Sequence, residues 1–486
     1  MNKFQPVTFY KGNNRTYRLL PFRFSELDET RFVLSNLSGE YLVAEKSETR
    51  QFIRHQLSQE SELYKRLRAS HFLVDDKSTV AEELVAIKVR TKYARLSEFT
   101  SLHMFVVTLR CEHSCPYCQV SRQSDDRVAF DMSKETASKA INLMMQSPSE
   151  AIKVEFQGGE PLLNFDLIQF IVEETSRINQ TCGKDLQFVI ATNLALITVE
   201  ILDYCAKHKI FISTSLDGPK SLHGKNRPRP GKDSYERTIA GIDQARRKLG
   251  RSSVSALMTT TADSLTQVRE IIDEYLTHGF EGIFLRPLSP YGFALKTKQF
   301  EAYSTQKWLN FYKEGLDYIL ELNKTGINFS EYYASTILSK MLTSQDPGYV
   351  DLMSPSGIGI AAVVYNYDGD VYASDESRML AEMGNTHFKI GNVHKDSYVE
   401  IFGNETLLNA LEDSFAYSCP QCHDCAYEPY CGSDPVYHYG RTGDYIGRKP
   451  NSEHCARNMG IIKYLITKMN DDPSTRQIFL KWANRK

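Results

Sequence analysis

The sequence lacks the features that mark nucleic-acid-binding, membrane and secreted proteins. Its 58 Lys and Arg residues nearly balance its 60 Asp and Glu residues, so the net charge of −2 favours neither a nucleic acid nor a membrane surface as a partner. No apolar run reaches the roughly 18 residues that a transmembrane helix needs. Residues 1–10 lack the apolar core of a signal peptide, and we therefore expect a cytoplasmic protein that binds no nucleic acid and no membrane.

The ten cysteines lack the distribution of a disulfide framework. Three lie between residues 111 and 118, and five lie between residues 419 and 455. Such tight groups are more typical of metal binding in a reducing compartment than of disulfides. Cys182 and Cys205 stand alone, and we expect both to be buried thiols.

A length of 486 residues suits two or three domains. We predict three of them: a small α+β module at 1–95, an α/β core at 96–325 and a cysteine-rich domain at 326–486. In the third, the turn residues Asp368 and Gly369 predict a hairpin between 358–365 and 370–372.

The first module contains a hairpin pattern over Phe32–Val43. Two amphipathic helices follow it, near Glu48–Gln56 and Ser61–Ser70. A free hairpin edge could bind a peptide by strand addition, whereas the alternative is an extension that only covers the core.

Strand and helix patterns alternate along the core segment. Ser133 can cap the first helix, whose apolar residues form one stripe. Six such units imply parallel strands joined by right-handed crossovers, with chemistry at the carboxyl ends of the strands. The predicted strands are 104–109, 152–156, 186–192, 210–215, 253–259 and 282–287, and the predicted helices are 133–146, 165–179, 197–208, 234–249, 264–278 and 305–323.

Three cysteines spaced C-x3-C-x2-C, namely Cys111, Cys115 and Cys118, follow the first predicted strand. Three thiolates can hold three irons of a [4Fe–4S] cluster and leave the fourth iron open. Zinc is the alternative, although structural zinc normally takes four protein ligands. The segment Gly158-Gly159-Glu160 ends the second predicted strand, where absent side chains allow the backbone to approach a ligand closely.

The cysteine motif and the Gly-Gly-Glu segment together resemble those of the radical S-adenosylmethionine (SAM) enzymes. The resemblance implies a partial (β/α)6 TIM-like barrel, in which the open iron chelates SAM and one electron cleaves SAM to a 5′-deoxyadenosyl radical. It also implies a set of SAM contacts from an aromatic residue, the Gly-Gly-Glu segment, further polar strand-end residues, an arginine and an apolar residue. The implied SAM-binding residues are Tyr117, Gly158, Gly159, Glu160, Asn193, Ser215, Arg227 and Leu285.

Three of these implied contacts have plain structural alternatives. Tyr117 would lie near the adenine, or it could be a residue that packs the cysteine loop. Arg227 would clamp the SAM carboxylate, because a guanidinium pairs bidentately and stays charged. It could instead be a solvated loop cation beside Arg229. Leu285 would contact the adenine, or it could be an ordinary core leucine.

The C-terminal cysteines resemble four positions of the SPASM domain, which carries auxiliary iron–sulfur clusters. The matching residues are Cys422, Cys425, Cys431 and Cys455, and four thiolates saturate one [4Fe–4S] cluster. Structural zinc is the alternative here too.

This resemblance is incomplete in an informative way. The positions that would supply a second auxiliary cluster are Ser356, Ser374 and Pro435, so we expect one auxiliary cluster. Cys419 is an extra cysteine that could replace a ligand, neighbour the cluster or take part in the chemistry. Asp375 stands where sulfatase maturases carry a proton-accepting Asp, and a solvated turn carboxylate is its alternative.

Residues 100–460 as a whole resemble radical SAM/SPASM maturases of ribosomally made peptides. The phrases Cys118-Gln-Val-Ser-Arg-Gln and Tyr427-Glu-Pro-Tyr-Cys-Gly-Ser-Asp-Pro-Val-Tyr are most similar to the His-Xaa-Ser system maturases. The resemblance implies a peptide or protein substrate, an electron donor such as flavodoxin or ferredoxin, and a partner maturase. A formylglycine-forming sulfatase maturase and a non-enzymatic iron–sulfur peptide-binding partner are the alternatives.

Overall fold

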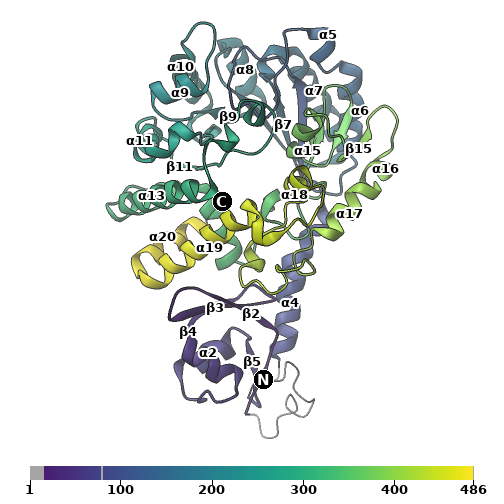
Figure 1. Cartoon of the computed structure of the whole chain (residues 1–486). Helices are drawn as coiled ribbons and strands as arrows, with labels where there is room; N and C mark the ends of the chain where they lie inside the picture. The colour runs from purple at the N-terminus through teal and green to yellow at the C-terminus, as the bar shows by residue number, and fades with distance from the viewer. Residues whose placement is uncertain (1–15, 78–79, 485–486) are drawn as a thin grey trace.

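A computed structural model describes residues 16–77 and 80–484. Residues 1–10, on which the expectation about a signal peptide depends, lie outside the described chain. The α/β core and the small N-terminal module lie at opposite ends of the molecule, and helix α4 (Ala81–Tyr93) runs between them (Figure 1). No helix among the described residues is long and apolar enough to cross a membrane.

One eight-stranded sheet organises the core, in the order β10-β9-β8-β7-β6-β13-β14-β15. Strands β6 to β10 pair in parallel, and helices alternate with them along the chain, which confirms the predicted α/β barrel-like fold. The strands are β6 (Leu102–Thr108), β7 (Ala151–Gly158), β8 (Asp185–Thr192), β9 (Phe211–Ser215) and β10 (Val254–Leu257). The core helices are α5 (Arg127–Phe130), α6 (Lys134–Met144), α7 (Phe165–Cys182), α8 (Val199–His208), α9 (Lys220–Asn226), α10 (Ser234–Leu249), α11 (Val268–Thr277), α12 (Phe293–Lys296) and α13 (Thr305–Lys324).

Local sequence explains the first of these helices. The hydroxyl of Ser133 caps α6 by accepting a hydrogen bond from the amide of Thr136 at 3.0 Å. The apolar stripe of the helix is buried against the sheet, as its spacing predicts. Its members include Ala137, Ala140, Ile141 and Met144.

The sixth strand differs from the prediction. Strand β11 covers only Gly282–Ile283 and pairs with β12 (Ser330–Glu331), not with β10. Just beyond its end, the amide of Leu285 donates to the side-chain carboxylate of Glu331 at 3.1 Å and so is not available to a neighbouring strand. The fifth and sixth units still meet, since the amide of Thr260 donates to the carbonyl of Arg286 at 2.9 Å.

The C-terminal segment extends the core sheet. Strands β13 (Ala362–Tyr365) and β14 (Asp370–Tyr372) form the predicted hairpin, and β15 (Lys389–Asn392) adds a third strand. Strand β13 also pairs in parallel with β6, so core and C-terminal segment share one sheet. The helices of this segment are α14 (Tyr332–Leu342), α15 (Asp375–Ala381), α16 (Tyr398–Phe402), α17 (Glu405–Asp413), α18 (Pro435–Thr442), α19 (Glu453–Asp471) and α20 (Pro473–Ala483).

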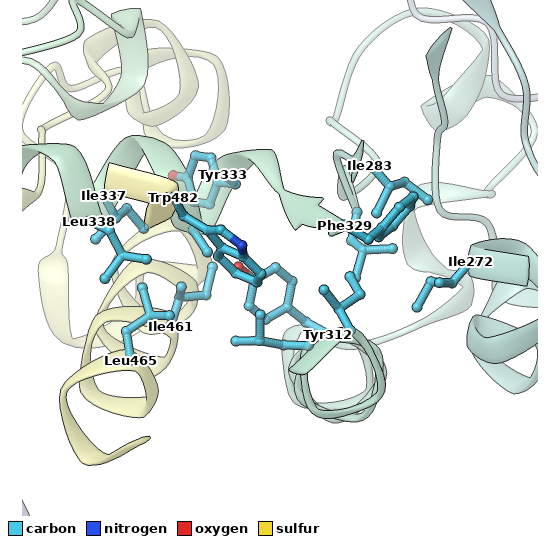
Figure 2. Close-up of a cluster of buried hydrophobic side chains, with 14 of the residues drawn as sticks. Ile272, Ile283, Tyr312, Phe329, Tyr333, Ile337, Leu338, Ile461, Leu465 and Trp482 are labelled. Carbon is cyan, nitrogen blue, oxygen red and sulfur yellow. The ribbon is translucent and has the colours of Figure 1, made fainter. Parts of the chain in front are cut away.

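A shared hydrophobic core joins the barrel to the last helices. Figure 2 shows Tyr312 of α13, Ile337 of α14, Ile461 of α19 and Trp482 of α20 packed around one centre. All four side chains are at most 4% exposed. The C-terminal helices are therefore held on the core by buried apolar surface.

The N-terminal module is a three-stranded antiparallel sheet with two helices. The predicted hairpin is confirmed as β3 (Arg31–Asn36) and β4 (Tyr41–Glu45), and the two predicted helices are α2 (Lys46–Ile53) and α3 (Glu62–Ala69). The prediction missed an edge strand, β2 (Phe22–Glu26). Two short strands, β1 (Arg18–Leu19) and β5 (Leu73–Val74), also pair with each other.

One face of this sheet packs on the C-terminal cysteine segment. Arg23 and Glu428 form a buried ion pair with 3.0 Å between nitrogen and oxygen. The amide of Ala426 donates to the hydroxyl of Ser25 at 3.2 Å, and the hydroxyl of Tyr430 donates to the carbonyl of Gly39 at 2.9 Å. The module is thus fixed against the cysteine segment.

None of the ten cysteines forms a disulfide. Cys205 is buried, as predicted, but Cys182 is exposed. The prediction for Cys182 was wrong because this residue lies at the end of α7, outside the buried stripe of that helix.

Candidate active site

A cavity of about 290 Å³ lies at the carboxyl ends of the core strands. We call it the strand-end cavity. It is lined by most of the residues that sequence reasoning selected, although they come from distant parts of the chain. Those residues are Cys111, Cys115, Tyr117, Cys118, Gly158, Gly159, Asn193, Ser215, Arg227 and Asp375.

The two glycines of this cavity pack against the start of the cysteine segment. The amide of Gly159 donates to the carbonyl of Thr108 at 2.8 Å. A Cβ atom on Gly159 would lie 2.3 Å from the carbonyl oxygen of Arg110, and one on Gly158 would lie 1.7 Å from that of Thr108. Only glycine allows this approach, so the pair fixes the cysteine segment to the end of β7.

The three cysteines suit an iron–sulfur cluster better than they suit free thiolates. Burial raises the pKa of Cys111, and it raises the pKa of Cys115 to about 12. These thiols therefore need the charge of a metal to ionise at neutral pH. Such a donor set fits a [4Fe–4S] cluster with one iron left open.

The neighbouring His113 does not complete a zinc site. Ligand atoms of Cys111, Glu112 and His113 lie within 4.8 Å of one another. Both ring nitrogens of His113 already have partners, however, because Nδ1 lies 3.0 Å from Glu112 and Nε2 lies 2.9 Å from the hydroxyl of Ser234. This histidine is a packing residue under the cysteine segment, and three thiols remain as the donor set.

Arg227 is held at the cavity wall by a buried carboxylate. Its Nε lies 3.1 Å from Asp217, whose side chain is fully buried. The hydroxyl of Tyr117 donates to the same carboxylate at 2.5 Å, and the guanidinium carbon lies 5.5 Å from the centre of the tyrosine ring. The arginine is therefore an oriented cation and not a solvated loop residue.

Two predicted SAM contacts do not reach the strand-end cavity. The fully buried carboxylate of Glu160 accepts hydrogen bonds from Thr192 at 2.6 Å and from the amide of Asn193 at 2.9 Å. It ties the end of β7 to the end of β8. Leu285 is also fully buried, within the hydrophobic core, as its structural alternative proposed.

Asp375 reaches the strand-end cavity although it is far along the chain from the core. It begins α15, which Ser374 caps. The guanidinium of Arg378 lies 3.0 Å from its carboxylate, and another nitrogen of this fully buried arginine donates to the carbonyl of Val120 at 3.3 Å. This carboxylate is thus anchored at the cavity and is not a solvated turn residue.

Sequence reasoning missed two polar residues inside the barrel. Glu155 and Gln157 of β7 line the strand-end cavity and are hydrogen-bonded to each other at 2.5 Å. Burial raises the pKa of Glu155. Their alternation with the buried Val154 and Phe156 was the available signal, because alternate residues of a barrel strand face its interior.

The C-terminal cysteines form a second group of desolvated thiols. Burial raises the pKa of Cys422 and of Cys425 to about 12 and that of Cys455 to about 11, and mutual repulsion among the thiolates adds to each shift. Burial also raises the pKa of Cys431. Four such thiols fit one fully ligated cluster.

The extra cysteine has a structural role. Cys419 is 1% exposed, and its thiol donates to the carbonyl of Asp413 at 3.0 Å. The residues at the missing ligand positions are also used structurally. Ser374 caps α15, Pro435 occupies the first turn of α18, and the amide of Ser356 donates to the hydroxyl of Ser414 at 3.0 Å.

Comparison with known proteins agrees with this geometry. Residues 105–275 match the model of the Radical SAM superfamily. An uncharacterised protein of Methanothermobacter thermautotrophicus is 33% identical over 192 residues, which are 38% of this chain and 67% of that protein. The radical SAM cyclopropyl synthase TigE of Paramaledivibacter caminithermalis is 26% identical over 151 residues, and the match spans 28% of this chain and only 31% of TigE.

The serine-type anaerobic sulfatase-maturating enzyme of Bacteroides thetaiotaomicron is 22% identical over 358 residues, 70% of this chain and 82% of that enzyme. Among solved structures, anSMEcpe with bound AdoMet (SAM) has a TM-score of 0.63 at 16% identity, covering 78% of this chain and 100% of its own. Streptococcus suis SuiB bound to the precursor peptide SuiA has a TM-score of 0.53 at 14% identity, covering 89% and 98%. At these identities the structures show a shared fold. The family match and the cysteine geometry together show that this chain belongs to the radical SAM superfamily, which implies a [4Fe–4S] cluster and SAM.

Proposed function

We propose that this chain is a peptide maturase that cleaves SAM reductively and removes a hydrogen atom from a ribosomally made peptide. The peptide would gain a crosslink or another oxidation. One observation carries the proposal: a single cavity brings three cysteines together with an oriented arginine and an anchored carboxylate. Two proteins of similar fold, SuiB and anSMEcpe, have been solved with peptides bound, which supports a peptide substrate.

Different residues of the strand-end cavity would bind the cluster and the separate parts of SAM. Cys111, Cys115 and Cys118 would hold the cluster, which together with SAM supplies a 5′-deoxyadenosyl radical when both are bound. Arg227 would pair with the SAM carboxylate, and the ring of Tyr117 would pack beside the adenine. The Gly158–Glu160 segment would hydrogen-bond the amino group of SAM.

Asp375 would accept a proton from the substrate. Its carboxylate lies at the strand-end cavity, where the reacting part of a peptide must approach. Arg378 fixes the orientation of this carboxylate, since it is itself buried and bonded to the chain. An oriented carboxylate is the usual requirement for general-base catalysis.

The C-terminal cysteines would hold one auxiliary [4Fe–4S] cluster. Because four thiolates would leave no open iron for binding SAM, these residues would hold a cluster that could supply only electron transfer, as the destination of the surplus electron from the oxidised peptide. A flavodoxin or ferredoxin would supply the electron that SAM cleavage needs. The likeness to His-Xaa-Ser system maturases further suggests a His-Xaa-Ser repeat peptide and a second maturase as partner.

The N-terminal module would hold the peptide by strand addition. Strands β2 and β4 are the two edges of its three-stranded sheet, so each has backbone groups that an extended peptide can pair with. Hydrogen–deuterium exchange of the full chain tests this, because a bound peptide should slow exchange over 22–26 or 41–45. If a peptide that the enzyme modifies leaves exchange unchanged at both edges, the module does not bind the peptide and only covers the core.

Co-expression with a peptide encoded beside this chain tests the function. Mass spectrometry should detect a peptide that has lost two hydrogens per crosslink, and only with the intact cysteine motif. Formylglycine in the peptide would assign a sulfatase-maturase-type reaction instead. An unmodified but tightly bound peptide would make the chain a non-enzymatic binding partner.

A further inference from the structure

A second, smaller cavity of about 40 Å³ adjoins the strand-end cavity. Arg286 lines both cavities, and the adjacent residues Asp375 and Glu376 line one each. We call it the carboxylate cavity, because Asp351, Glu376 and Asp434 all line it although they come from three separate segments. The two cavities therefore meet at Arg286, with Asp375 in the wall of one and Glu376 in the wall of the other.

None of these carboxylates forms an ion pair within residues 16–77 and 80–484. Arg286 and Arg457 also line the cavity, and their charges oppose the effect of burial on the pKa of Asp351. Burial and repulsion among the three acids raise the pKa of each carboxyl. Unpaired buried carboxylates are costly, and a bound cation would offset that cost.

Two buried polar side chains in the same wall also lack partners. The hydroxyl of Tyr291 and the indole N–H of Trp308 line the carboxylate cavity and form no hydrogen bond, although their side chains are only 2% and 1% exposed. Tyr291 lies close enough to Asp434, Glu376 and Asp351 for all three to raise its pKa further. Buried polar groups in native proteins normally have partners, so these two point to a guest.

Aromatic rings form another part of the cavity wall. The ring centres of Phe284 and Tyr333 lie 5.5 Å apart, and those of Tyr333 and Tyr349 lie 5.7 Å apart. Rings beside carboxylates attract an alkylammonium group through cation–π contacts and charge together. The hydroxyl oxygen of Tyr291 can accept a hydrogen bond from such an ammonium group.

We propose that the carboxylate cavity holds the cationic side chain of the substrate peptide while the neighbouring reacting carbon faces the strand-end cavity. This inference rests on the proposed function and names its substrate class: peptides with a lysine or arginine close to the modified residue. The volume admits a head group and not a whole side chain, so an ammonium fits better than a guanidinium.

The test compares two synthetic probes on the reconstituted enzyme with SAM. Acetyl-Ala-Lys-Ala-amide carries the cation, and acetyl-Ala-norleucine-Ala-amide has the same chain without it. Ligand-observed NMR should show the lysine probe bound at least about tenfold more tightly. Equal affinity of the two probes overturns the proposal, and this comparison needs no variant.

Variants of the carboxylate cavity then test whether the lysine side chain binds there. The double change Asp351→Asn and Glu376→Gln should abolish the preference for lysine, whereas Glu314→Gln on the exposed surface of α13 should preserve it. A preference that survives the double change overturns the proposal. SAM cleavage without peptide is measured in parallel: its absence in the wild type refutes the proposed function, whereas cleavage without a lysine preference refutes only the cation site.

Discussion

The Nε atom of Arg227 lies 3.1 Å from the carboxylate of Asp217, which also accepts a hydrogen bond from Tyr117 at 2.5 Å. Asp217 is fully buried and Tyr117 is 5% exposed. A cation, a carboxylate and an aromatic ring are thus held together at the wall of the strand-end cavity. The arginine keeps its orientation before any ligand arrives, which lowers the cost of binding an anionic group.

Replacing this arginine should weaken SAM binding. Arg227→Gln removes a charge-assisted hydrogen-bond donor, which is worth about 1.5–3 kcal/mol, so the Kd for SAM should rise about tenfold or more. Arg229→Gln is the matched control, because Arg229 pairs with Asp233 and does not line the cavity. Equilibrium dialysis with the reconstituted protein measures both. Equal losses in the two variants would refute the carboxylate role of Arg227.

The iron content should reveal two clusters. We expect about eight irons per chain, because Ser356, Ser374 and Pro435 cannot complete a second auxiliary cluster. Cys419→Ser should leave that number unchanged, since this thiol is bonded to the carbonyl of Asp413. Cys422→Ser should lower it. A reproducible count near twelve, or a loss of iron with Cys419→Ser, would contradict this assignment.

Asn458 should tune the auxiliary cluster. Its amide donates to the sulfur of Cys431 at 3.7 Å, and the hydroxyl of Tyr333 holds its oxygen at 2.8 Å. Hydrogen bonds to cluster sulfurs shift the reduction potential, so Asn458→Leu should lower the midpoint potential of that cluster. Asn470→Leu, an exposed change on the same helix, is the control. A redox titration followed by electron paramagnetic resonance measures this potential. Equal midpoint potentials in both variants and the wild type would contradict the account.

Binding of the lysine probe should depend on pH. The carboxylates attract a cation only when ionised, so affinity is full above their pKa values and falls as the pH decreases. Burial raises the pKa of Asp351 and Glu376, so the loss should begin nearer neutrality than for exposed acids. NMR titrations between about pH 8 and about pH 6 should show this loss for the lysine probe and none for the norleucine probe.

Local patterns in the sequence were enough to predict the strands and helices of the core and the edge of the sheet at which the active site lies. The Ser133 cap and the apolar stripe that follows it specify α6 without reference to the rest of the fold. The cysteine motif and the Gly158–Gly159 pair both follow strands, so a parallel sheet must bring them together. Asp375 was placed by family resemblance alone, because no local pattern shows that α15 begins at the cavity.

Long-range contacts account for what could not be predicted. The pairing of β13 with β6 joins segments about 260 residues apart in sequence, and neither strand carries a signal for the other. The buried ion pair of Arg23 and Glu428 joins residues that are 405 positions apart in the sequence. The contact of the N-terminal module with the cysteine segment therefore could not be predicted from the sequence either. The hydrogen bonds of Glu160 to β8 could not be predicted either, because its motif gives no signal for the side-chain and backbone donors at the end of that strand.

The most direct test of the account is SAM cleavage by the anaerobically reconstituted, reduced protein, followed as 5′-deoxyadenosine by chromatography. The wild type should form this product, and so should Cys205→Ala, because Cys205 is buried outside both cysteine groups. The combined change of Cys111, Cys115 and Cys118 to Ala should abolish it while the C-terminal cluster is retained in the iron analysis. Product formation by the triple variant, or none by a wild type that carries both clusters, would contradict the account.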